Sequence, residues 1–224
     1  MLSIIIPVLN EEKTIGSVIK NVKSSISGDN YEIIVIDGGS NDNTVSIAKS
    51  SCDQLITSPA GRGVQLNYGA RASQGDTLLF VHADTILPVE FDKMITNAIS
   101  TSGKSWGRFD IKLSGKKYIF RIVESLVNLR SRITSISTGD QCLFMSRALF
   151  ENVNGYKDIP LMEDIDISKR LKKISIPVCL PHKVITSSRR WEEKGIIRTI
   201  LLMWWLRFLF FAGVSPDNLK RLYQ

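Results

Sequence analysis

The chain has 224 residues, enough for one substantial domain or two small ones, and 43% of them are hydrophobic, which predicts a packed core rather than general disorder. The formal net charge of +7 fits a phosphate-bearing ligand, an anionic membrane surface or a solvated basic surface. No nucleic-acid-binding motif accompanies the charge, so we expect no nucleic-acid partner. Three cysteines, far apart and odd in number, argue against a disulfide framework and favour a reducing compartment, so we expect a cytoplasmic protein.

Strand and helix patterns alternate through the first third of the chain. Asn10 is the expected N-cap of the first helix, with Glu11 and Glu12 in its first turn. Short apolar runs predict strands at residues 3–8, 31–37, 54–58 and 76–81. We interpret the first run as a strand and not as a signal peptide. Helical spacing covers residues 15–26, 45–49 and 64–72. This alternation predicts an α/β fold with a mostly parallel, Rossmann-like sheet flanked by helices.

The rest of the chain is less regular, and it contains no low-complexity linker or repeat. Patterns predict a strand at residues 106–113, a loop running into a strand at 139–145, and helices at 88–100, 118–132 and 162–174. We therefore expect one domain over residues 1–195, followed by an apolar helical extension over 196–224.

Polar side chains follow three of the predicted strands. They are Asn10 with Glu11, then Asp37, then His82 with Asp84. In a parallel sheet, ligands bind beyond the carboxyl ends of the strands, so these residues should converge on one edge. The chain has neither a dinucleotide-binding glycine fingerprint nor a Walker sequence. A bound nucleotide would therefore need another group for its phosphates, and a Mg²⁺ or Mn²⁺ ion on Asp84 would serve.

A second carboxylate cluster lies at the start of the helix predicted for residues 162–174. Asp164 shares a stripe with Ile167, Leu171 and Ile174, so it should point inward. Asp166 points away from this stripe and can pair with Arg170. An acidic first turn stabilised by the helix dipole is the alternative explanation; it suits Glu163 better than Asp164.

The segment at residues 195–216 is the most apolar part of the chain. Arg198 and Arg207 interrupt it, so it does not read as a transmembrane helix, which needs about twenty mostly apolar residues. A core helix, a homodimer interface and peripheral contact with the inner face of a membrane all remain open.

Four segments, IIIPVLNEEKTI, IIVIDGGSNDNT, FVHADT and MEDIDISKRL, resemble in order and spacing the family 2 glycosyltransferases with the GT-A fold. The segments GRGVQLNYGA, GDQCLF and SRRWEEKGIIRT further resemble a small stand-alone subgroup associated with arsenosugar biosynthesis. The resemblance covers residues 2 to about 191. It implies an inverting, metal-dependent transfer of a sugar from a nucleotide sugar, most often a UDP-sugar, to an acceptor hydroxyl. A small metabolite and a lipid phosphate are both open as the acceptor.

The resemblance also implies roles for residues on the donor side. Pro7 and Glu11 match contacts around the base and ribose, and Asp37 matches the acidic residue that reads the base, although Asp is also a common turn residue. The full set of nucleotide-binding candidates is Pro7, Val8, Leu9, Asn10, Glu11, Asp37, Gly39, Arg62, Gln65 and Ala83.

The same resemblance makes Asp84 the second acidic residue of a D-x-D element and hence a metal ligand. His82 departs from the pattern, because the family usually has an Asp at this position. It is open whether His82 is a weak metal ligand, a hydrogen-bonding group or a structural histidine. Asp164 matches the general base, and the neighbouring Glu163 should raise its pKa and improve it as a base.

Further candidates lie on the phosphate and acceptor side of the site. Guanidinium groups match phosphate oxygens, and Trp191 can stack on a sugar or simply pack. Loop polarity alone would also explain Asp140 and Gln141. The candidates for acceptor or phosphate contacts are Arg62, Arg108, Asp140, Gln141, Arg189, Arg190 and Trp191.

Two other functions remain. A sugar-phosphate nucleotidyltransferase would use a similar sheet, but it needs a glycine-rich basic loop after the first strand, where this chain has the acidic PVLNEE. A non-catalytic protein that binds sugar nucleotides or a membrane surface would account for the missing first Asp of the D-x-D element.

Overall fold

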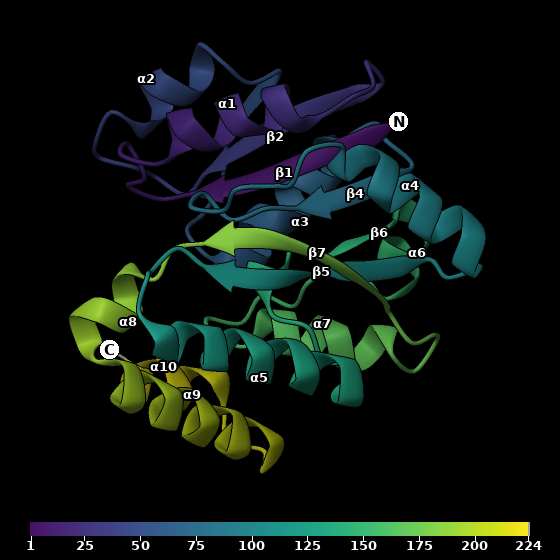
Figure 1. The fold of residues 1–224 in the computed structure, drawn as a ribbon. Coiled ribbons are helices and arrows are strands. Elements are labelled where there is room, and N and C mark those ends of the chain that lie inside the picture. Colours follow the sequence, from purple (N-terminus) through teal and green to yellow (C-terminus); the bar gives the residue numbers. More distant parts are fainter. Residues whose placement is uncertain (224) are drawn as a thin grey trace.

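The structure, a computed structural model, describes residues 1–223 except for the side chain of Arg190. Its centre is one seven-stranded sheet with the order β3-β2-β1-β4-β6-β5-β7 (Figure 1). Strand β6 runs antiparallel to both of its neighbours, and the other neighbouring pairs are parallel, so the predicted mostly parallel sheet is confirmed. The strands are β1 Leu2–Val8, β2 Tyr31–Asp37, β3 Gln54–Thr57, β4 Thr77–Phe80, β5 Trp106–Leu113, β6 Phe144–Ser146 and β7 Val178–Thr186.

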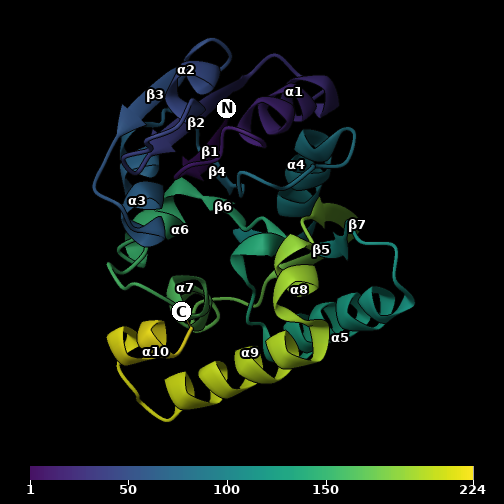
Figure 2. The same ribbon diagram turned by 90° about the vertical axis from the view of Figure 1, so that its left-hand side faces the viewer.

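Helices cover both faces of this sheet (Figure 2). They are α1 Ile15–Ser25, α2 Thr44–Lys49, α3 Arg62–Ala72, α4 Phe91–Ser102, α5 Tyr118–Thr134, α6 Arg147–Asn152, α7 Glu163–Leu171, α8 Arg189–Lys194, α9 Ile196–Phe211 and α10 Pro216–Tyr223, with a short 3₁₀ turn at Gly139–Gln141. Successive residues of a strand point to opposite faces, so Ile4 and Ile6 of β1 join the core under α1 and α4, whereas Ile5 joins the core under α3, α6 and α7. Burial on both faces explains why β1, β2 and β4 read as continuous apolar runs.

Several predicted boundaries change in the structure. Asn10 is not a helix cap: its φ is 56°, its Oδ1 accepts from the Asn41 N–H at 2.9 Å, and α1 starts only at Ile15, so Glu11 and Glu12 precede the helix. The helix expected from residue 88 starts at Phe91, because Glu90 adopts a left-handed conformation with φ of 60°. Helix α7 ends at Leu171, and Ile174 beyond it is exposed.

Strand β7 and the short helices α6 and α8 were not predicted at all. Strand β7 carries a proline and two polar residues in its middle, Pro181, His182 and Lys183, and all three are exposed. It lies at the edge of the sheet, where a missing backbone N–H is tolerated. Helix α6 has only six residues, too few for a periodic pattern, and begins where the Ser146 side chain accepts a hydrogen bond from the Leu149 N–H.

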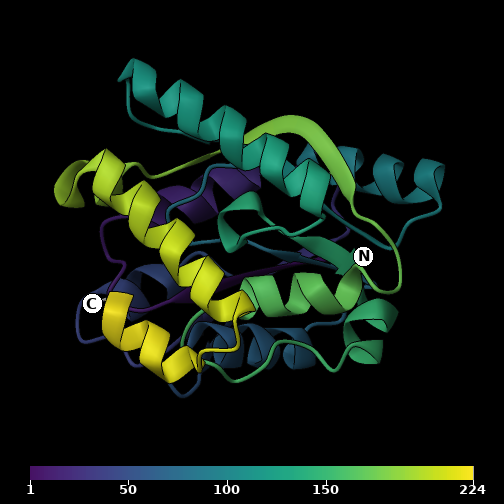
Figure 3. The same ribbon diagram turned by 90° about the horizontal axis from the view of Figure 1, so that it is seen from below.

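The C-terminal helices lie on the underside of the molecule in the view of Figure 1, which faces the viewer in Figure 3. Helix α9 lies along α5, with Ile196 and Ile200 packed near Phe120 and Val123. Farther on, Leu206 of α9 and Leu219 of α10 are fully buried in a cluster with residues that precede and begin α7, namely Ile136, Met162 and Ile165. No helix within residues 1–223 combines the length and the apolar character needed to cross a bilayer.

Candidate active site

The loops that follow β1 and β2 form one hydrogen-bonded unit at the carboxyl edge of the sheet. The Asn10 N–H donates to the Ser40 hydroxyl at 2.9 Å, and the Glu11 N–H donates to the Thr44 hydroxyl at 2.7 Å. Beneath them, the buried Gln65 amide of α3 donates to the carbonyls of Val8 and Ile36 at 2.8 and 2.9 Å. These bonds fix the two strand ends relative to each other.

Asp37 and Gln65 therefore have structural tasks at this edge. The Asp37 carboxylate is buried and accepts from the backbone N–H groups of Gly39 and Ser40 at 3.0 and 3.1 Å, which is the turn geometry expected of an Asp before glycines. Gln65 is only 5% exposed, and its side-chain nitrogen donates to two backbone carbonyls. In this conformation Gln65 holds the strand ends and does not face the site.

A cluster of carboxylates lies at the end of β4. Burial raises the pKa of Asp84, the neighbouring Glu11 and Asp140 raise it further, and Arg189 only partly opposes them. Asp140, from the 3₁₀ turn, adds a buried Oδ1 that has no hydrogen-bond partner among the described residues. Negative charges gathered in this way disfavour one another unless a cation joins them.

This edge suits a hard divalent cation that shares its shell with phosphates. Residues 1–223 contain no group of three His, Cys, Asp or Glu side chains placed to hold a metal by themselves. Mg²⁺ and Mn²⁺ commonly take only one or two protein carboxylates and complete their shell with phosphate oxygens and water. Asp84, with the unpartnered Asp140 oxygen nearby, meets that smaller requirement.

His82 is held as a neutral imidazole. Burial and, to a smaller extent, the positive charge of Arg62 together lower its pKa to about 3. Its ring packs directly on Gly139, where an added Cβ would lie 2.4 Å from Nε2 of His82. A neutral ring can act as a weak metal ligand or a hydrogen-bonding group, so the structure leaves both roles open and adds a packing role.

Asp164 and Glu163 begin α7, but they differ in their surroundings. Oδ2 of Asp164 accepts from the Gly139 N–H at 2.9 Å, and Ile167 and Leu171 on the same stripe are buried, as predicted. Glu163, the catalytic candidate beside Asp164, is 4% exposed and paired with Arg62 at 3.3 Å, so it is not an ordinary exposed acid of a first helical turn. Burial raises the pKa of Glu163, Asp164 raises it further, and Arg62 opposes both. The predicted pair of Asp166 with Arg170 is present at 2.7 Å.

A cavity of about 590 Å³ connects Asp164 with the C-terminal helices. Arg62, His82, Asp140 and Asp164 line its inner end. Helices α5 and α9 form its other walls, which are apolar except for Arg130 and Arg207. A second, smaller cavity of about 200 Å³ brings Asp84 together with Arg189.

Two predicted acceptor contacts are wrong for this structure, because both side chains are fully buried beneath the site. Arg108 forms an ion pair with Asp110 inside the core. Gln141 accepts from the Thr138 N–H at 3.1 Å and donates to the Ser131 hydroxyl at 3.0 Å. Arg108 points inward because side chains alternate along its strand, and Gln141 is held by the capping of the 3₁₀ turn. Polarity in the sequence alone does not distinguish such buried polar residues from residues of a binding site.

The remaining predicted contacts are spread along the same edge. Trp191 lines the larger cavity and also packs beside Phe120, so both of its proposed roles stay open. Among the donor-side candidates, Leu9 is exposed and Val8 and Ala83 are buried. The side chain of Arg190 lies outside the described part of the chain. Arg130 and Arg207 were missed as site residues; the only signal was an arginine inside the apolar C-terminal run.

Solved structures with the same arrangement bind nucleotide sugars. TarS of S. aureus, residues 1–349 in complex with UDP, aligns with a TM-score of 0.68 at 19% identity, over 83% of this chain and 60% of that one. Glucosyl-3-phosphoglycerate synthase of Mycobacterium tuberculosis, in complex with Mn²⁺ and UDP-glucose, aligns with a TM-score of 0.58 at 22% identity, over 82% and 69%. The fold is therefore the GT-A fold of these glycosyltransferases.

Sequence comparison gives the family. The profile described as "Glycosyl transferase family 2" matches residues 3–151, more than half of the chain, and the chain belongs to that family. Among curated relatives, the glucosyl-3-phosphoglycerate synthase of Mycolicibacterium smegmatis is 31% identical over 128 residues, which is 50% of this chain and 42% of that protein. The chain thus matches less than half the length of this relative. The narrower resemblance to the arsenosugar-associated subgroup stays a prediction.

Proposed function

We propose that this protein is an inverting, metal-dependent glycosyltransferase that moves a sugar from a UDP-sugar to an acceptor hydroxyl. The observation that carries the proposal is that Asp164 and His82 line one cavity, while Asp84, two residues beyond His82, joins the acidic cluster at the end of β4. Asp140 links the two groups, because it lines this cavity and also raises the pKa of Asp84, which supports a base and a diphosphate site next to each other. The related synthase of Mycobacterium tuberculosis, solved with Mn²⁺ and UDP-glucose, supports the choice of donor and metal.

In this proposal the rigid loops after β1 and β2 receive the nucleoside. Pro7 and Glu11 border the base and ribose. Asp37 is already bonded to two backbone N–H groups, but a carboxylate has about four acceptor positions, so it can still accept from a base N–H. The fixed turn also spends no further conformational entropy when the nucleotide binds.

The diphosphate would lie beside Asp84. A divalent metal bound there supplies charge neutralisation for the departing nucleoside diphosphate. Arg189 shares a cavity with Asp84, and Arg62 lines the neighbouring one, so both guanidinium groups are available to phosphate oxygens. Neutral His82 lines the larger cavity together with Arg62 and adds no charge there.

Asp164 acts as the base. The acceptor oxygen bonds to the anomeric carbon as the bond from that carbon to the diphosphate oxygen breaks, with its electron pair leaving on the nucleotide. The hydroxyl proton passes to the Asp164 carboxylate, which the Gly139 N–H holds in place. One displacement from the face opposite the nucleotide inverts the anomeric centre.

The products test this reaction directly. Incubation with a UDP-sugar, Mn²⁺ and a panel of hydroxylated acceptors should release UDP, and NMR of the product should show the anomeric configuration opposite to that of the donor. Release of pyrophosphate would instead indicate a nucleotidyltransferase. The acidic grouping of Glu11, Asp84 and Asp140 counts against that alternative, because a triphosphate there would need a basic loop.

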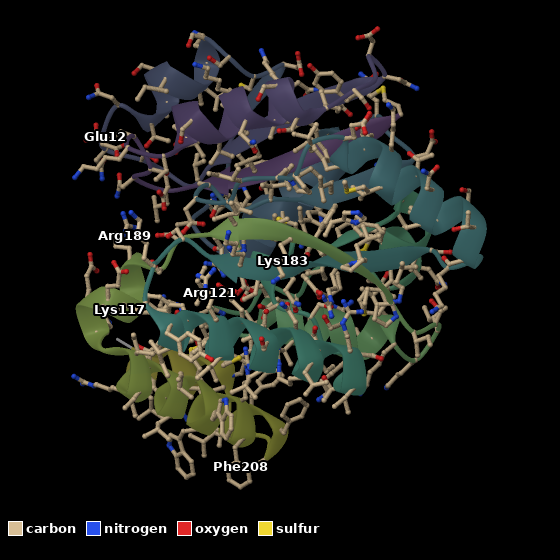
Figure 4. All side chains as sticks on the ribbon, in the orientation of Figure 1. Glu12, Lys117, Arg121, Lys183, Arg189 and Phe208 are labelled. Carbon is tan, nitrogen blue, oxygen red and sulfur yellow. The ribbon has the colours of Figure 1, made fainter. Side chains whose placement is uncertain are left out.

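We further infer that the outer face of α5 and α9 rests on an anionic bilayer. Six large apolar side chains of α9 are 53–71% exposed, and Phe208 points away from the body of the molecule (Figure 4). Neighbouring α5 exposes a parallel set. Lys117 and Lys194, both exposed, flank this face, and the chain carries a charge of +7. The exposed residues of α9 are Ile197, Leu201, Trp204, Trp205, Phe208 and Phe211, and those of α5 are Ile122, Leu126, Leu129 and Ile133.

Sedimentation with vesicles tests this contact. Vesicles containing phosphatidylglycerol should bind the protein, phosphatidylcholine vesicles should bind it less, and Phe208→Ser with Trp205→Ser should weaken both. A protein that stays with the supernatant and forms a dimer, lost in the same variant, would instead assign this face to a second copy of the chain.

A further inference from the structure

Two arginines from different helices meet in the larger cavity without carboxylate partners. Arg130 of α5 and Arg207 of α9 both line it. Neither forms an ion pair with a carboxylate of the described residues. Nε and Nη2 of Arg130 and Nε of Arg207 are buried and have no hydrogen-bond partner within residues 1–223. A buried donor without a hydrogen-bond partner destabilises the folded protein, so these three nitrogen atoms favour a ligand that can accept hydrogen bonds from them.

The two guanidinium groups also disfavour each other. Burial and, after it, the positive charge of Arg207 lower the pKa of Arg130 to about 10. Asp140 and Asp164 lie near enough to oppose this effect in both arginines, but neither of them pairs with an arginine. An anion with several oxygens, such as a phosphate monoester or a carboxylate, would satisfy the unpartnered donors and remove the repulsion.

The rest of the cavity wall is apolar. Leu126 and Leu129 of α5 and Met203 and Trp204 of α9 line it, and three of these four side chains are at least half exposed. A ligand that carried only an anionic group would leave this wall in contact with water. A ligand with an apolar chain or ring beside its anionic group would cover it.

We propose that this cavity is the acceptor site and that the acceptor is an anionic amphiphile: Arg130 and Arg207 hold its anionic group, and its apolar body lies between α5 and α9. The inference rests on the proposed function for the identity of the reacting partner. Because Asp164 lines the same cavity, a hydroxyl close to the anionic group can reach the base. The anionic group is an anchor in this reaction, and the hydroxyl is the nucleophile.

Calorimetric titration of the full chain with octyl phosphate, in the absence of any nucleotide, tests the site. Octyl phosphate should bind at least about 10-fold more tightly than inorganic phosphate, because burial of its eight-carbon chain against the apolar wall outweighs the cost of ordering that chain. Octanol, which has the chain without the anion, should bind more weakly than octyl phosphate. Equal binding of octyl phosphate and inorganic phosphate, or no binding of either, would overturn the proposal.

Matched variants locate the binding. Arg130→Gln and Arg207→Gln should each weaken octyl phosphate binding about 10-fold or more, whereas Arg198→Gln, on the same helix but not in this cavity, should leave it unchanged. Each variant should retain its affinity for UDP with Mn²⁺, which controls for folding. Undiminished binding in both cavity variants would refute the site. If the wild-type protein bound octyl phosphate but not UDP, that result would refute the proposed function and still support the anion site.

Discussion

The backbone N–H of Gly139 donates to Oδ2 of Asp164 at 2.9 Å, while the Cα of Gly139 packs against the imidazole of His82. One residue of the 3₁₀ turn therefore positions the proposed base from α7 against the end of β4. A side chain at this position would lie 2.4 Å from Nε2 of His82, closer than real Cβ contacts come. Only glycine fits between these two groups.

Gly139→Ala should therefore impair catalysis. The added methyl group must displace His82 or the turn, and a shift of about 1 Å in catalytic geometry can cost about 100-fold in rate. UDP release from a UDP-sugar measures the effect. The loss of rate caused by Gly139→Ala should be smaller in a His82→Ala background, where the ring is absent. As a control, Gly28→Ala should leave the rate unchanged, because its Cβ would meet Asp92 at an ordinary 3.4 Å. Equal costs of Gly139→Ala in the two backgrounds would contradict the packing argument.

Asp164→Asn should abolish most of the transfer and preserve donor binding. The amide keeps the shape of the side chain but cannot take the acceptor proton, and general-base catalysis contributes about 10²–10⁴-fold. The comparison is between the rate of UDP release and the calorimetric affinity for UDP with Mn²⁺. Retained activity would favour another base, an acceptor whose own anion attacks, or a non-catalytic binding protein.

Asp84→Asn should remove the metal dependence of nucleotide binding. The neutral amide is a poor ligand for a hard cation, so Mn²⁺ should no longer improve the affinity for UDP. Asp76→Asn is the matched control, because Asp76 precedes the same strand at its opposite end and is exposed. An unchanged effect of Mn²⁺ in Asp84→Asn would mean that the metal, if it binds, uses other residues.

Glu163→Gln should stabilise the protein increasingly as pH rises. The folded pKa of Glu163 is raised above 4.5, mainly by burial, so the protonated form is the better one in the folded state. Its contribution to stability is present below pH 4.5 and is lost as pH rises through the folded pKa. Glutamine keeps the shape and does not ionise, so it avoids that loss.

Urea unfolding of the wild type and Glu163→Gln, at several pH values from 4 to 8, measures the difference. The urea midpoint of the variant should rise relative to that of the wild type as pH increases across this range. Glu193→Gln, at an exposed position, controls for the change in net charge. A midpoint difference that stays constant or reverses would show that the Arg62 pair outweighs the burial of Glu163.

The predictable parts of the fold are those in which local pattern and burial agree. The strand expected at residues 31–37 and the strand expected at 106–113 appear with the same bounds, because an apolar run between turn residues has few other solutions. Strand β7 carries exposed polar residues at an edge, and its pairing with β5 depends on contacts far away in the chain. No local pattern encodes such a pairing.

The residues of the candidate site also differ in whether a local sequence pattern predicts them. Asp84 and Asp164 could be proposed from the sequence, because Asp84 follows a predicted strand and Asp164 begins a predicted helix on its apolar stripe. The ion pair of Glu163 with Arg62 joins two helices that lie far apart in the chain, so no local pattern around Glu163 encodes it. Arg130 and Arg207 come together only after α9 packs along α5, so their relationship becomes visible in three dimensions alone.

Calorimetric titration of the wild-type protein with UDP and UDP-glucose, with and without Mn²⁺, tests the central claim most directly, because it needs no knowledge of the acceptor. We predict that both ligands bind saturably and that Mn²⁺ strengthens their binding. In Asp84→Asn, Mn²⁺ should no longer strengthen it. Absence of binding to UDP, UDP-glucose and other nucleoside diphosphates under both conditions would contradict the account.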